Sequence, residues 1–87
     1  RVKRESIVHK GVLQKFLRNP ELAEKLLETG EQMIAECAVK DKIWGIGLSM
    51  WDEERFCVDK WKGQNLLGQI LMQVRAEISV QSQNIEK

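Results

Sequence analysis

Residues 41–48 read Asp-Lys-Ile-Trp-Gly-Ile-Gly-Leu, and residues 61–75 read Trp-Lys-Gly-Gln-Asn-Leu-Leu-Gly-Gln-Ile-Leu-Met-Gln-Val-Arg. These two stretches hold four of the six glycines and two of the three tryptophans. Glycine loses more backbone entropy on folding than alanine, and tryptophan is concentrated in cores and binding sites. Ordinary helix or strand formation therefore does not explain the pattern, and we expect the two stretches to line a site.

The composition restricts the class of protein. A chain of 87 residues is one small domain with a modest core. Its 14 basic and 13 acidic residues are interspersed, which disfavours a broad electrostatic surface for nucleic acid or membrane. Cys37, Cys57 and the single histidine form neither a zinc motif nor a disulfide framework, so we expect no metal. Without an apolar run of roughly 20 residues or a signal peptide, a cytoplasmic protein with reduced thiols is expected.

Two helices are predicted before residue 30. Residues 5–17 carry apolar side chains at spacings typical of an amphipathic helix. Asn19 is expected to cap a second helix over residues 20–28, with proline at its first position and Gly30 as a left-handed stop. Together these helices form a hairpin. His9 lies off the densest part of the first apolar stripe, and we expect it to be exposed or half-packed rather than a catalytic base.

The remaining chain changes period. Residues 33–39 alternate as a short extended segment, in which Glu36 is the single charge, either facing water from an edge or held by a partner in a site. Residues 48–62 have no clean period, which predicts a long polar loop. From Gln64 onward the spacing predicts a long core helix that fades after Ser79 into a polar tail. The expected fold is mainly α: a helical hairpin plus a long C-terminal core helix, with the extended segment between.

Several motifs occur in a fixed order along the chain. They are Leu13-Gln14-Lys15-Phe16, Pro20-Glu21-Leu22-Ala23, Leu26-Leu27-x-Thr29-Gly30, Glu36, Asp41-x-x-Trp44-Gly45-Ile46-Gly47-Leu48 and Trp61-x-Gly63-x-Asn65-x-Leu67-Gly68-x-x-Leu71-Met72-x-Val74-Arg75. In this order they resemble the C-terminal half of the NADAR family, the YbiA-like N-glycosidases. The resemblance covers residues 5–76, and its two-part Trp-Gly and Asn-x-Leu-Gly signature is fairly specific.

The resemblance implies a mostly helical fold and hydrolysis of an N-glycosidic bond between a ribose and a base. The substrates that it implies are ribosylamino-pyrimidine intermediates of riboflavin synthesis or ADP-ribosyl groups, with no metal or redox cofactor. Members of the family also have an N-terminal half, with a Glu-His-Tyr-Phe-Gln-Ala-Gln-Lys-type helix that this chain lacks. The chain starts at Arg1 rather than at a methionine. We therefore expect residues 1–87 to be one domain, the C-terminal half of a NADAR-like domain, inactive alone and partnered by the missing half and a ribosyl or ADP-ribosyl substrate.

Cleavage of a ribosyl C–N bond builds positive charge on the sugar and negative charge on the departing base. A site therefore needs a carboxylate near the anomeric carbon and a donor near the base. Asp41, three residues before Trp44, is the first candidate catalytic residue, and Glu36 is the second. Trp44 is either a stacking surface for base or ribose, or a core residue. Gly45 and Gly47 would allow backbone N–H groups to approach a ligand phosphate.

Asn65 stands at the start of the long helix, where backbone amides favour phosphate, although a plain helix cap is the competing interpretation. Gly63 and Gly68 indicate the close approach of a ligand or of another backbone. Arg75 is expected to form a salt bridge. The predicted substrate-binding residues are Trp44, Gly45, Gly47, Trp61, Gly63, Asn65 and Gly68. The alternative function is a non-catalytic helical module that binds a ligand or a protein, while nucleic-acid binding is disfavoured by the near-zero net charge.

Overall fold

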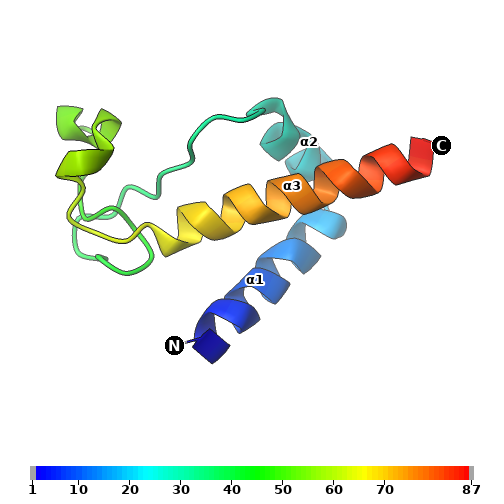
Figure 1. Ribbon diagram of the computed structural model, residues 1–87, viewed down its shortest axis with the longest axis horizontal. Coiled ribbons are helices and arrows are strands. Elements are labelled where there is room, and N and C mark those ends of the chain that lie inside the picture. The colour runs from blue at the N-terminus through cyan, green and yellow to red at the C-terminus, as the bar shows by residue number, and fades with distance from the viewer. Residues whose placement is uncertain (1, 87) are drawn as a thin grey trace. The chain divides into compact units, whose positions relative to one another are not determined.

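The computed structural model describes the backbone of residues 2–86 and the side chains of residues 3–80. Its helices, in chain order, are α1 (Val2–Leu17), α2 (Pro20–Glu28), the short 3-10 helices η1 (Glu53–Phe56) and η2 (Val58–Lys60), and α3 (Leu66–Glu86) (Figure 1). Residues 2–86 contain no β-strand, so the predicted mainly α fold is confirmed. No helix within these residues is long and apolar enough to cross a membrane.

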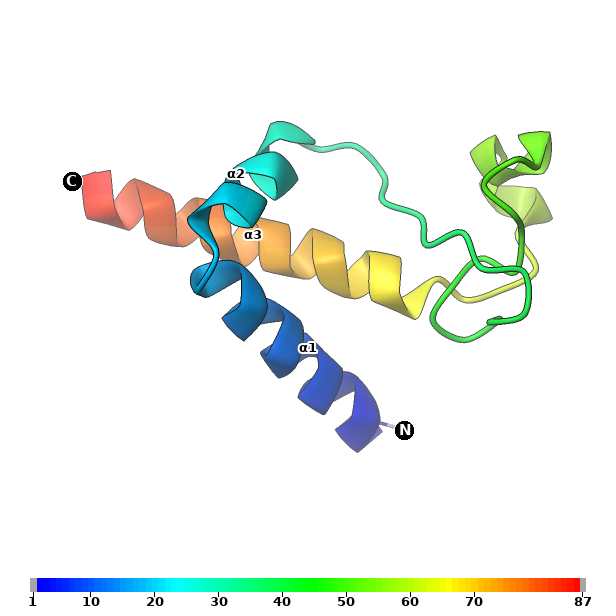
Figure 2. The same ribbon diagram turned by 180° about the vertical axis from the view of Figure 1, so that it is seen from behind.

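The described residues divide into two compact units. One unit contains the chain up to Gln32 together with the chain from Ile70 onward, and the other is Met33–Gln69. In the first unit, α1 and α2 are joined by a short connection, as the predicted hairpin requires (Figure 2). The core of this unit contains Leu26 from α2 and a row of α3 side chains spaced four residues apart, which share one helix face. The members of that row are Ile70, Val74 and Ile78.

Side chains of α3 bond to α1 and to the segment that follows α2. The Nε2 atom of His9 lies 2.6 Å from Oε1 of Glu77, and these side chains are 28% and 40% exposed. His9 is therefore half-packed, as predicted. The Nη1 atom of Arg75 donates hydrogen bonds of 2.8 Å to the Thr29 hydroxyl and to the Gln32 carbonyl. Both acceptors are neutral oxygens in the segment that follows α2, so among the described residues Arg75 forms these hydrogen bonds in place of the predicted salt bridge.

The ends of α2 follow local signals only in part. Pro20 occupies the first helical position, and Gly30 has the left-handed φ of 63° that the stop requires. The predicted side-chain cap from Asn19 is wrong. Its amide nitrogen instead donates to the Lys15 carbonyl at 2.6 Å, so this side chain satisfies the C-terminal end of α1.

Two predictions about the second half of the chain also need correction. The segment predicted as a loop over residues 48–62 contains η1 and η2, and η1 begins because the Asp52 carboxylate accepts the Glu54 N–H at 2.9 Å. Helix α3 does not fade after Ser79 but continues to Glu86. The sequence after Ser79 contains no glycine or proline, and glutamine is a good helix former, so nothing local ends the helix.

Candidate functional site

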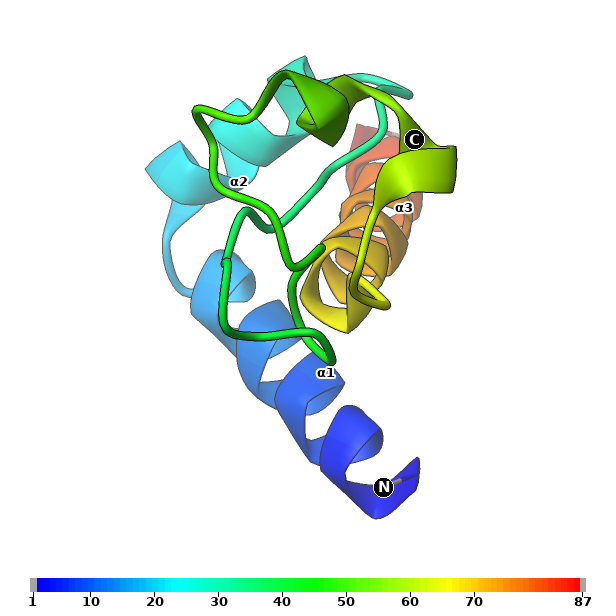
Figure 3. The ribbon, with the colours of Figure 1, turned by 90° about the vertical axis from the view of Figure 1, so that its left-hand side faces the viewer.

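The two signature stretches are bonded to each other along the main chain of the second unit. The N–H groups of Lys62, Gln64, Asn65, Leu66 and Leu67 donate to the carbonyls of Ile46, Lys42, Gly45, Ile43 and Trp44, at 2.8 to 3.1 Å. Figure 3 shows the loop of residues 41–48 beside the first turn of α3. The structure thus brings together the residues that the sequence singled out, and it holds them through backbone atoms.

This pairing changes the interpretation of the start of α3. Leu66 and Leu67 are the first residues of the helix, and their N–H groups already donate to carbonyls of the loop. Free N–H groups at a helix start are what make it attractive to phosphate. The predicted phosphate site at this helix start therefore loses the N–H donors of Leu66 and Leu67.

Asn65 is buried and uses both ends of its amide. It is 2% exposed and adopts a left-handed φ of 55°, which is uncommon for a residue other than glycine. Its Oδ1 accepts the Glu36 N–H at 2.8 Å, and its Nδ2 donates to the Ile34 carbonyl at 2.8 Å. The amide thereby fixes the backbone of residues 34–36, the segment that carries one of the two candidate carboxylates.

The glycines of the signature permit close approach of backbone to backbone. A Cβ on Gly63 would overlap the Gly45 carbonyl oxygen, and a Cβ on Gly68 would overlap the Ile34 carbonyl oxygen and the Asn65 amide. Of the two alternatives that the sequence left open for Gly63 and Gly68, a ligand or another backbone, the structure shows another backbone.

Two further glycines, Gly45 and Gly47, are buried within the same packing. Gly47 has a φ of 74°, which L side chains rarely adopt. A Cβ on Gly47 would also lie only 3.0 Å from the Cβ of Lys62. A Cβ on Gly45 would lie 2.9 Å from the Glu36 carbonyl oxygen and 2.9 Å from the Ala38 Cβ.

Asp41 organises the turn that leads to Trp44. Its Oδ1 accepts the N–H groups of Ile43 at 3.1 Å and of Trp44 at 2.8 Å, which is the arrangement of an Asx turn. The Trp44 side chain itself is half-buried. Asp41 therefore has a structural task at one oxygen, and its hydrogen bonds fix the backbone from which the Trp44 indole projects.

Glu36 differs from Asp41 in how its carboxylate is used. Its N–H is bonded to Asn65, and its carbonyl accepts the Ile46 N–H at 2.9 Å, so the backbone is fixed on both sides. The residue is half-buried. Its carboxylate makes no hydrogen bond or ion pair with any residue that the structure describes. Of the two carboxylates, Glu36 is the one that combines a fixed backbone with uncommitted oxygens.

Trp61 lines a groove of about 340 Å³ in the second unit. The groove is lined by Met33, Ala35, Cys37, Arg55, Phe56, Val58 and Trp61. The first three are alternate residues, as the predicted period of two requires, although residues 33–38 form no strand. The sequence did not identify Arg55 and Phe56, and an Arg-aromatic pair within a loop is the signal that could have identified them.

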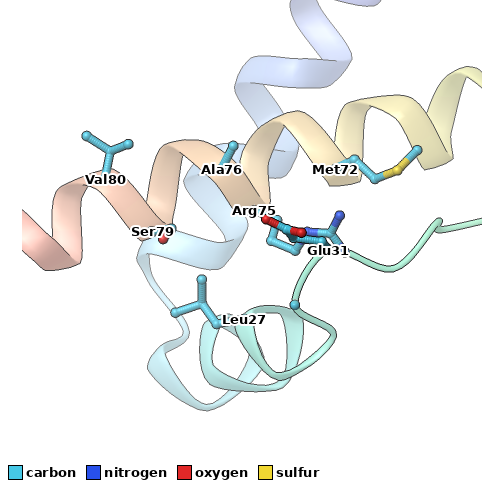
Figure 4. A pocket seen from close by; sticks show the side chains of 8 residues that line it. Leu27, Glu31, Met72, Arg75, Ala76, Ser79 and Val80 are labelled. Atoms are coloured by element: carbon cyan, nitrogen blue, oxygen red, sulfur yellow. The ribbon is translucent and has the colours of Figure 1, made fainter.

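A second hollow, of about 500 Å³, lies in the first unit between the end of α2 and the middle of α3 (Figure 4). Met72, Arg75, Ala76, Ser79 and Val80 line it from α3. None of the predicted catalytic or substrate-binding residues lines this hollow. We therefore place the candidate site in Met33–Gln69.

Comparison with known proteins gives several sequence matches. The chain is 48% identical over 71 residues to an N-glycosidase of Acanthamoeba polyphaga mimivirus, which is 82% of this chain and 42% of that protein. It is 36% identical over 72 residues to an N-glycosidase of Nostoc punctiforme, covering 83% of the chain and 39% of that protein. It is 40% identical over 67 residues to a riboflavin biosynthesis protein of Vibrio vulnificus, covering 77% of the chain and 15% of that protein. No solved structure matches.

The chain spans less than half of the length of each of these relatives. The NADAR domain model matches residues 1–79, which include every predicted catalytic and substrate-binding residue. On this match the chain belongs to the NADAR domain family.

Proposed function

We propose that the protein containing this chain is an N-glycosidase that hydrolyses the bond between a ribose and a base. The observation that carries the proposal is the 48% identity to a protein named N-glycosidase, over 82% of the chain. The name of the Vibrio vulnificus relative supports ribosylamino-pyrimidine intermediates of riboflavin synthesis as substrates. ADP-ribosyl groups are the second substrate class, because they contain the same type of ribosyl linkage.

The proposed reaction assigns a separate role to each of three side chains. As the C–N bond breaks, its electron pair passes to the base nitrogen, which takes up a proton from the solvent, and positive charge develops at the anomeric carbon. The Glu36 carboxylate stabilises that charge and accepts a proton from the water that adds to the carbon. Trp44 provides an aromatic face for the ribose or base. Asp41 stabilises the turn that leads to Trp44, and it is the second candidate for the carboxylate that stabilises charge on the sugar.

Asn65 contributes to this site as a positioning residue. Its amide binds the backbone on both sides of Ala35, through the Ile34 carbonyl and the Glu36 N–H. A displacement of about 1 Å at a catalytic group can lower a rate by about 100-fold. The amide clamp therefore supports the Glu36 assignment, since it fixes the backbone from which the carboxylate projects.

The test, on the protein that contains this chain, is the release of free base from a ribosylamino-pyrimidine phosphate and from an ADP-ribosylated nucleoside, measured by chromatography. Replacing Glu36→Gln should lower kcat/KM by about 100-fold or more, because the amide can neither take a proton nor stabilise positive charge. Glu53→Gln is the matched control, since Glu53 is an exposed carboxylate in η1 that is not among the predicted site residues and does not line the groove. Equal activity of both variants would remove Glu36 from the mechanism.

A second test concerns Trp44. Trp44→Ala should abolish binding of the ribosyl substrate, measured by calorimetry. Because the side chain is half-buried, its loss should lower the free energy of unfolding by less than the roughly 3 to 5 kcal/mol of a core tryptophan. Unfolding of the variant would instead assign Trp44 to the core.

The alternative function, a protein-interaction module, has its own supporting observation. Trp51 is 83% exposed and Phe56 is 78% exposed, and large exposed aromatic residues are enriched at protein interfaces. This function would be preferred if the protein with an intact signature released no base and bound neither ADP-ribose nor ribose phosphates.

A further inference from the structure

The groove that contains Trp61 is built from two segments of the second unit. Met33, Ala35 and Cys37 form one wall, and the residues around η1 and η2 form the other. Its volume of about 340 Å³ lies within the range of roughly 300 to 1,000 Å³ that is typical of small-molecule sites. The groove is thus the size of a site for a compact ligand.

The second wall has a flat, positively charged surface. The Arg55 guanidinium lies 4.1 Å from the centroid of the Phe56 ring, which is a cation–π contact. The Nη1 atom of Arg55 also donates to the Asp52 carbonyl at 2.9 Å, so the guanidinium is held in place before any ligand arrives. Guanidinium planes and aromatic rings are the groups on which unpaired bases stack.

The orientation of Trp61 is also fixed. Its Nε1 donates to the Arg55 carbonyl at 2.9 Å, which uses the only hydrogen-bonding group of the indole. The half-buried indole can therefore offer a ligand in the groove its aromatic surface, but no hydrogen bond.

We propose that this groove binds the planar, electron-rich base of a ribosyl substrate, stacked against Trp61 and the Arg55–Phe56 pair. The proposal rests on the proposed function, to which it adds a subsite for the base. Glu36 is not among the lining residues, but it lies between two of them, Ala35 and Cys37. The residue proposed to act on the sugar therefore belongs to the same short segment that forms a wall of the base subsite, with its side chain on the opposite face from Ala35 and Cys37.

Charge and size favour a base over the other occupants of an apolar groove. Arg55 is the only charged residue among the seven that line it, and its positive charge complements the negative charge that the base acquires on leaving. A stable protein interface engages roughly 20 to 30 residues on each side, several times the number in this groove.

Cys37 provides a direct reporter for occupancy of the groove. The chain has two cysteines, and Cys57 does not line the groove, so Cys57→Ser leaves a single thiol there. The rate at which iodoacetamide alkylates Cys37 is measured by mass spectrometry, in the presence of adenine, of uracil or of ribose 5-phosphate. At ten times its Kd, one of the bases should slow alkylation about tenfold. Ribose 5-phosphate, which lacks a heterocycle, should not.

Two aromatic variants in the same background separate stacking from general hydrophobicity. Phe56→Ala should weaken the protection by a base about 5- to 150-fold in Kd, because one stacking surface is lost. Trp51→Ala is the matched control, since Trp51 is as exposed as Phe56 but lies outside the groove. It should leave the protection unchanged.

Three results would overturn the subsite: no protection by either base, equal protection by ribose 5-phosphate, or equal sensitivity to the two aromatic variants. The proposed function fails separately, in the assay of base release. Release without protection of Cys37 would keep the N-glycosidase and discard the subsite. Protection without release would keep a base-binding groove and discard the enzyme.

Discussion

Gly11 and Gly68 are both helical glycines, but their surroundings are opposite. A Cβ on Gly11, in α1, would meet no atom within 4 Å, whereas a Cβ on Gly68, in α3, would overlap the Ile34 carbonyl and the Asn65 amide. Sequence alone gives both residues the same helix penalty. The fold therefore requires a glycine at position 68, where a Cβ has no room, but not at position 11.

This difference predicts substitutions of opposite sign. Gly11→Ala should raise the free energy of unfolding by about 0.5–1 kcal/mol through the better helix propensity of alanine. Gly68→Ala should lower it by about 1–3 kcal/mol, because the added methyl group displaces the Asn65 amide or the Ile34 backbone. Urea unfolding followed by circular dichroism measures both. A neutral Gly68→Ala would mean that these contacts relax easily.

Asp41 provides a second prediction at the level of a single residue. Asp41→Asn keeps an Oδ1 acceptor for the N–H groups of Ile43 and Trp44, so stability should change by less than about 0.5 kcal/mol. Asp41→Ala removes the acceptor and should destabilise the protein by about 1 kcal/mol. If the Asn variant is stable and active, Asp41 is a turn residue only. If it is stable and inactive, Asp41 takes the catalytic role that we propose for Glu36.

How much the sequence reveals about a residue depends on how far away its partner lies. Gly30 was predicted correctly because its left-handed backbone belongs to the helix end beside it. Asn65 has its bonding partners 29 and 31 positions away, so its type suggested a cap or a ligand contact but not a clamp on residues 34–36. The signature therefore singled out stretches that the structure brings together, but it did not reveal the contacts that join them.

Among the elements, the His9–Glu77 pair connects α1 to α3. His9 and Glu77 are partly exposed, and such pairs typically stabilise a protein by about 0.2–1 kcal/mol. A double-mutant cycle with His9→Gln and Glu77→Gln should give a coupling energy in this range, measured by urea unfolding. Insensitivity of the coupling to salt would indicate a neutral hydrogen bond rather than an ion pair.

The helices themselves were predictable because their apolar spacing and end signals are local. Residues 48–62 were harder to assign, since η1 and η2 are too short to show a period. Asp52 was the available signal, because aspartate commonly precedes the first turn of a helix. Phe56 does not indicate η1 through any apolar spacing, because its side chain is exposed and packs against Arg55 instead of in a core.

For the whole molecule, the relevant fact is that the chain spans 42% of its mimivirus relative. We expect the 87-residue chain alone to release no base under conditions in which that relative is assayed in parallel. The physical reason is that a carboxylate and an aromatic face stabilise a developing charge only when water is excluded around them. Here Trp44 and Glu36 are only half-buried. Comparable release by the isolated chain would show that residues 1–87 contain a complete site.

The carbonyls that receive the first N–H groups of α3 also determine when this helix can form. A helix must fix several residues before its first bond, and here the opening turn is completed by groups more than twenty positions earlier in the chain. A peptide of residues 64–80 in water should therefore be frayed at its start. During folding, the first turn of α3 should become ordered only after the loop of residues 41–48 has closed onto it, late on the folding pathway.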